Sequence, residues 1–109
     1  MAYDEQLAER VRAVLSDEFG VTEQKMFGGL AFMLRGNMCC GILGDDLILR
    51  LGPERGKTAL DEPGISVMDF TGRPMKAFVM AEPSAVASDA GLHRWVSEAV
   101  TFAGSLPEK

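Results

Sequence analysis

The 109-residue chain is 47% hydrophobic and 25% charged, which is the balance of one globular domain spanning residues 1–109. It has no apolar run near the ~20 residues of a membrane span, and its acidic N-terminus does not resemble a signal peptide. These features predict a cytoplasmic protein. A net charge of −5 and a pI near 4.8 disfavour direct nucleic-acid binding, which relies on basic residues.

The charge is uneven along the chain. Residues 25–80 carry seven basic and six acidic residues, whereas both ends are acidic. Direct binding of nucleic acid would require these bases to form a continuous positive face.

Residues 4–19 are predicted to form an amphipathic helix. Asp4 is placed to cap its start, and Gly20 to end it in a left-handed turn. Its apolar stripe consists of Leu7, Val11, Val14, Leu15 and Phe19.

Three strands are predicted next, over residues 30–35, 38–43 and 47–51. The short connections at 36–37 and 44–46 contain glycine with asparagine or aspartate, which is typical of hairpin turns. Such short connections favour antiparallel pairing.

The second half of the chain begins with a short helix over residues 53–60, which Pro53 can start. Strands at 66–70 and 75–81 follow, joined by a turn. A final helix is expected over residues 90–104, capped by Ser88 or Asp89. Its buried stripe consists of Leu92, Trp95, Val96, Ala99, Phe102 and Ala103.

The element order is therefore α-β-β-β-α-β-β-α. It predicts an α+β fold of two layers, with a five-stranded antiparallel sheet and three helices. Both faces of the sheet look apolar, and three helices are too few to cover both. We therefore expect a contact surface on the sheet, and a homodimer formed through that face or through a sheet edge.

Two pairs of adjacent residues stand out. Gly28-Gly29 lies beside a strand, where glycine usually marks a bulge, a bend or a close backbone approach. Cys39 and Cys40 lie within a predicted strand, so their thiols should point to opposite faces. We interpret them as small buried side chains, with a redox or metal-binding role as the alternative.

The residues suited to catalysis do not form a recognisable site. His93 lies in the final helix and is expected at the surface, and Asp45-Asp46 and Asp61-Glu62 fall in predicted turns. The two cysteines and one distant histidine do not match zinc-ligand spacing. We expect a protein that is not an enzyme and that holds no metal and no cofactor.

Three basic residues are candidates for binding. Arg50 interrupts an apolar run and should point to the less buried face, and Arg73 and Lys76 flank the turn at residues 71–74. A salt bridge from Asp69 to Arg73 or Lys76 would pin that turn. The alternative is a site for a small anion or for a partner protein.

Six internal methionines are numerous for this length. Most are expected in the core, although adaptable binding surfaces also use methionine. The six are Met26, Met33, Met38, Met68, Met75 and Met80.

Several motifs resemble the N-terminal domain of the TfoX/Sxy family. They are residues 25–32 (Lys-Met-Phe-Gly-Gly-Leu-Ala-Phe), Cys40-Gly41, residues 49–51, residues 68–76 and the apolar stripe of the final helix through Pro107. The resemblance covers nearly the whole chain. It implies a two-layer fold similar to that of secretion chaperones, with structural roles for Phe27, Gly28, Gly29, Gly72 and Trp95.

Family members of the competence-regulator type carry a second, C-terminal helical domain and promote transcription of DNA-uptake genes. This chain is expected to be a stand-alone N-terminal domain. The resemblance implies a protein-interaction module with a regulatory role and an unidentified protein partner. The alternative is a small-ligand or anion-binding protein, or an enzyme, that uses Arg50, Arg73, Lys76 and the two cysteines.

Overall fold

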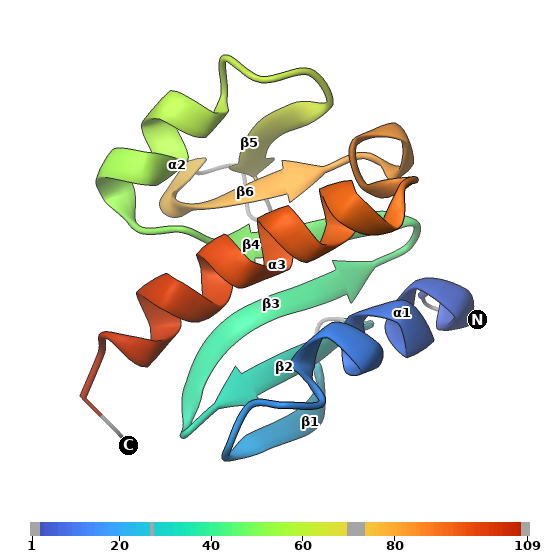
Figure 1. The fold of residues 1–109 in the computed structure, drawn as a ribbon. Coiled ribbons are helices and arrows are strands. Elements are labelled where there is room, and N and C mark those ends of the chain that lie inside the picture. Colours follow the sequence, from blue (N-terminus) through green and yellow to red (C-terminus); the bar gives the residue numbers. More distant parts are fainter. Residues whose placement is uncertain (1–2, 27, 70–73, 108–109) are drawn as a thin grey trace.

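The computed structural model describes residues 3–26, 28–69 and 74–107. Figure 1 shows helices packed against one twisted antiparallel sheet. The elements in chain order are α1 (Glu5–Leu15), β1 (Val21–Met26), β2 (Gly29–Leu34), β3 (Asn37–Leu43), β4 (Asp46–Arg50), α2 (Pro53–Ala59), β5 (Ile65–Asp69), β6 (Pro74–Ala81), a short 3-10 helix (Pro83–Val86) and α3 (Asp89–Gly104).

The sheet has the strand order β1-β2-β3-β4-β6-β5, and all neighbouring strands are antiparallel. The predicted α+β class, the three helices and the antiparallel sheet are confirmed, but the described residues form six strands rather than five. The missed strand is β1, in which Thr22, Glu23, Gln24 and Lys25 are all exposed. A polar strand at a sheet edge lacks the apolar alternation by which strands are recognised.

The first helix is shorter than predicted. Asp4 does cap it, since its Oδ1 accepts hydrogen bonds from the backbone N–H groups of Gln6 and Leu7 at 2.9 and 3.2 Å. The helix ends at Leu15, where the Ser16 hydroxyl donates to the carbonyl of Ala13 at 2.8 Å. The placement of Phe19 in the apolar stripe of this helix was therefore wrong, because Phe19 lies beyond the helix and is 78% exposed.

The other two helices lie close to their predicted limits. Pro53 occupies the first turn of α2, and the Ser88 hydroxyl accepts from the Gly91 N–H at 3.0 Å to cap α3. Within the described part of the chain, none of the helices is long and apolar enough to cross a membrane.

The core lies between one face of the sheet and the helices. α1 and α3 lie across this face, and α3 also packs against α1 (Figure 1). Two rows of paired residues run across the strands beneath α3, and all of their members are buried: Leu30, Ile42, Leu47 and Ala81 form the first row, and Phe32, Cys40, Leu49 and Val79 form the second. Leu92, Trp95, Val96 and Ala99 of α3 complete the cluster.

The two glycines at the start of β2 have different roles. Gly28 lies in the turn with φ of +77°, a conformation that L side chains rarely adopt, and a Cβ there would meet open space. Gly29 begins the strand, and a Cβ there would lie 2.2 Å from the backbone oxygen of Ile42. Gly29 is therefore required by the close approach of β3, which is one of the roles considered for the pair.

Replacing these glycines should separate the two effects. Gly28→Ala should cost about 1 kcal/mol of unfolding free energy through backbone strain. Gly29→Ala should cost about 3 kcal/mol, because the β2–β3 backbones must move apart. Urea denaturation of both variants measures the difference, and equal losses would contradict the assigned roles.

Candidate functional site

One face of the sheet lies opposite α1 and α3 (Figure 1). Strand register places its residues next to one another across β2, β3, β4 and β6: Ala31 pairs with Gly41, Gly41 with Ile48, and Ile48 with Met80, while Met33 pairs with Met38. We call these six residues the methionine face. Met33, Met38 and Met80 are half-buried, whereas Ala31 and Ile48 are buried.

Gly41 lies at the centre of the methionine face, and its missing side chain leaves room for that of Met38. A Cβ at Gly41 would lie 3.1 Å from the terminal methyl group of Met38 and 2.9 Å from the backbone oxygen of Leu30. The Met38 side chain therefore lies over Gly41. The flexible Met38 side chain thus covers the backbone at Gly41 and occupies the space that the Cβ of another residue type would need.

Arg50, a predicted binding residue, ends β4 opposite Phe78 and is half-buried. Its guanidinium carbon lies 5.6 Å from the centre of the Phe78 ring and 5.8 Å from that of Phe102. Its Nη1 donates to the carbonyl of Met38 at 3.3 Å. Its Nε is buried and has no hydrogen-bond partner in the described residues. The two aromatic rings hold the charge in place, and one donor is left unsatisfied.

The other predicted site residues are only partly covered by the described structure. Arg73, Gly72 and Phe27 lie outside the described residues, and so does the side chain of Lys76 in β6. The predicted salt bridge from Asp69 to Arg73 or Lys76 lies outside them as well. The predicted grouping of Arg50 with Arg73 and Lys76 thus also lies outside the described residues.

The two cysteines are both in the core, so the prediction that their thiols point to opposite faces was wrong. The register between β2 and β3 shifts after Phe32, which pairs with Cys40, because the next pair is Met33 with Met38. Cys39 is thus the extra residue of a β-bulge, and a bulge changes side-chain direction. Cys39 and Cys40 are free thiols with exposed fractions of 1% and 0%.

The environment of the thiols opposes reactivity. A hydrogen bond with Cys39 and burial in the core both raise the pKa of Cys40 well above its ordinary value. The thiolate is the reactive form of cysteine, so a raised pKa lowers its reactivity.

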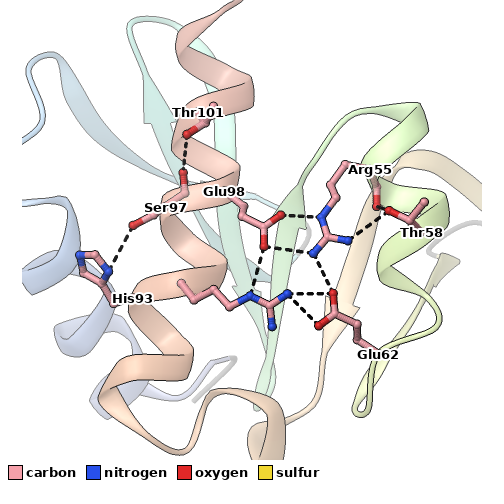
Figure 2. Close-up of polar contacts among 8 residues, drawn as sticks. Arg55, Thr58, Glu62, His93, Ser97, Glu98 and Thr101 are labelled. Carbon is pink, nitrogen blue, oxygen red and sulfur yellow. Dashed lines mark hydrogen bonds and ion pairs between the residues drawn. The ribbon is translucent and has the colours of Figure 1, made fainter.

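A four-residue ion-pair network joins α2 to α3 (Figure 2). Arg55 of α2 donates from Nε to Glu98 Oε1 at 2.5 Å and from Nη2 to Glu62 Oε2 at 2.7 Å. Arg94 of α3 contacts Glu62 Oε1 at 2.7 Å and Glu98 Oε2 at 3.4 Å. Each carboxylate therefore bridges both guanidinium groups.

Trp95 lies beneath this network and is buried. The guanidinium carbons of Arg94 and Arg55 lie 4.4 and 5.3 Å from its ring centre. The structure thus places Trp95 in the core, with its ring against two cations.

The sequence did not predict this network, because Glu62 falls in a predicted turn, where a side chain is usually solvated. Glu62 is in fact half-buried and bound by two arginines. The i,i+4 spacing of Arg94 and Glu98 signalled part of the network, but α2 supplies the other part across a separation of 43 residues from Arg55 to Glu98. His93 is exposed as predicted, with Nδ1 3.5 Å from the Ser97 hydroxyl (Figure 2).

Comparison with family models matches the TfoX N-terminal domain over residues 13–103. The chain belongs to the TfoX N-terminal domain family. The matched segment contains all six strands, α2 and nearly all of α3, together with the methionine face and the ion-pair network. Neither the curated proteins nor the solved structures contain a significant match to it.

The buried thiols of this TfoX N-terminal domain should be nearly inert while it is folded. We expect a disulfide reagent to modify Cys39 and Cys40 about a hundredfold more slowly in buffer than in concentrated urea, because the native thiols must first be exposed by opening. Absorbance of the released thiolate measures both rates. Equal rates in the two solvents would contradict the burial.

The ion-pair network should make stability depend on pH. Hydrogen bonds from Arg55 and then Arg94 lower the pKa of Glu62 below its ordinary value of 4.5. Because the folded-state pKa is the lower one, this stabilisation is present above about pH 4.5 and is lost as the pH falls further.

Glu62→Gln should therefore cost about 1 kcal/mol of unfolding free energy at pH 7, and less at pH 3.5. Urea denaturation at both pH values measures this gap. The matched control is Glu54→Gln, an exposed change on α2, which should have little effect at either pH. A Glu62→Gln gap that does not shrink on acidification would contradict the assigned role.

Proposed function

We propose that this TfoX N-terminal domain is a non-catalytic protein-interaction module with a regulatory role in the cytoplasm. The methionine face is the observation that carries the proposal. It is an apolar patch on the side of the sheet away from α1 and α3, with three half-buried methionines. Contiguous apolar surface outside the core is typical of protein contact sites.

The chemistry of this face suits a protein partner with an apolar surface. Methionine is flexible and polarizable, so a methionine-rich surface can adapt to the shape of its partner. At the centre of the face the flexible Met38 side chain lies over Gly41, so a partner would meet methionine there. The net charge of −5 also favours a protein over nucleic acid.

The regulatory part of the proposal rests on the family. The TfoX/Sxy resemblance supports a role in controlling transcription through contact with another protein. This chain would then contribute the contact surface, while the DNA is bound by its partner.

A small-ligand or anion-binding function is the second candidate, and the unsatisfied Nε of Arg50 favours it. A buried donor without an acceptor can attract an anion. Two observations weigh against this function. Phe78 and Phe102 already lie against the guanidinium group of Arg50. Cys39 and Cys40, the other candidate residues, are packed in the core on the other side of the sheet.

The two proposals are separated by a pull-down from the native host, analysed by quantitative mass spectrometry. Met33→Gln combined with Met38→Gln makes the methionine face polar with little change of volume. We expect this variant to retain about tenfold less of a partner than the unmodified chain, as the loss of ~1.4 kcal/mol implies.

The control for this experiment is Leu60→Gln, which changes an exposed apolar residue away from the face. It should bind the partner normally. Equal binding by the methionine variant would contradict the proposal. A small anion found on the purified chain by native mass spectrometry, and lost in Arg50→Ala, would favour the second candidate.

A further inference from the structure

The outer edge of β1 is an unpaired sheet edge in the described structure. β1 stands at one end of the strand order and pairs only with β2. Its residues from Thr22 to Lys25 are exposed. Such an edge is a template for another strand, because its outward N–H and C=O groups lack partners within the sheet.

The register of β1 shows which backbone groups point outward. Arg35 N–H donates to the carbonyl of Gly20 at 2.9 Å, and the next pair along the ladder is Val21 with Leu34. Hydrogen-bonded and non-hydrogen-bonded pairs alternate in an antiparallel ladder. Thr22 and Gln24 therefore bond to β2, whereas Val21, Glu23 and Lys25 direct their backbone groups to the free edge.

The two charged side chains of this edge are opposite in sign and two residues apart. Glu23 pairs with Phe32, whose side chain is in the core, so Glu23 lies on the helix side of the sheet. Arg12 of α1 fixes its carboxylate with two hydrogen bonds, of 2.7 and 2.8 Å. Lys25 is on the same side by strand alternation, and no ion pair to it is found in the described residues.

We propose that two copies of this chain pair antiparallel through β1, with Gln24 of one copy opposite Gln24 of the other. This register places Glu23 of each copy opposite Lys25 of the second copy. Both charge pairs are attractive, and the outward backbone groups of residues 23 and 25 face each other. The two six-stranded sheets join into one, with both methionine faces on the same side of it.

Charge selects this register over its neighbours. A two-fold axis at Glu23 would place two carboxylates opposite each other, and one at Lys25 would place two ammonium groups opposite each other. An axis at Thr22 would place Glu23 opposite Val21. Edge charges normally discourage strand pairing, but this pattern is complementary to itself in one register, as a symmetric dimer requires.

The inference does not depend on the proposed function, since it concerns the purified chain alone. Crosslinking tests the register. Directly opposed residues of a non-hydrogen-bonded pair lie within disulfide range, so Gln24→Cys should form a covalent dimer under mild oxidation. Thr22→Cys is the matched control, because it is exposed on the same side of the strand. Its two copies would lie about 13 Å apart, and it should stay uncrosslinked.

A charge exchange tests the pairing of Glu23 with Lys25. Lys25→Glu turns both attractive pairs into repulsive ones and should raise the dimer dissociation constant about tenfold or more. Glu23→Lys should do the same. An equimolar mixture of the two variants restores opposite charges at both pairs and should form a heterodimer, which shows that each variant is still folded.

Analytical ultracentrifugation measures these constants, with Lys57→Glu on α2 as the control of equal charge change. The control should dimerise like the unmodified chain. Three results would overturn the proposal: an unmodified chain that stays monomeric at roughly 0.5 mM, a dimer unaffected by Lys25→Glu, or equal crosslinking of the two cysteine variants.

Discussion

Burial of one sheet face beneath α1 and α3 is the constraint on which the rest of this structure depends. The two rows of apolar residues that cross β2, β3, β4 and β6 lie under α3, and all of them belong to the buried core. Removing this area from water is the main favourable term in the stability of so small a domain. The features discussed next follow because the helices cover one face of the sheet rather than both.

The first consequence is that the two faces of the sheet have different roles. On the helix side, a bulge turns both Cys39 and Cys40 inward, which adds small apolar groups to the core. On the other side, alternate residues of the same strands are also apolar, and methionine is their most frequent type. The methionine face thus arises from the same strands as the core, and it supports a role in protein contact.

The second consequence concerns the ends of the sheet. At the β5–β6 end, ion pairs among four residues hold α2 against α3: Arg55, Glu62, Arg94 and Glu98. These ion pairs add to the packing of a short helix that has few buried residues. At the β1 end, Arg12 fastens Glu23 to α1 but leaves the strand edge open. Ion pairs thus hold a helix over one end of the sheet, whereas the outer edge of β1 at the other end has no strand partner in the described residues.

Local pattern was sufficient to locate three helices and five strands, because caps, prolines, glycine turns and apolar periodicity act between residues close in the chain. The same signals predicted the antiparallel arrangement and the unusual role of Gly29.

Four features depended on contacts between distant segments. β1 is recognised by its pairing with β2. The directions of the Cys39 and Cys40 thiols follow from the register shift between β2 and β3. Glu62 meets Arg94 only after α2 folds onto α3, and Arg50 lies between two rings from different elements. Polar and charged residues carry no periodic burial signal in the sequence, so their contacts could not be predicted from it. Those contacts depend on how the apolar face packs, which brings together residues that are distant in the chain.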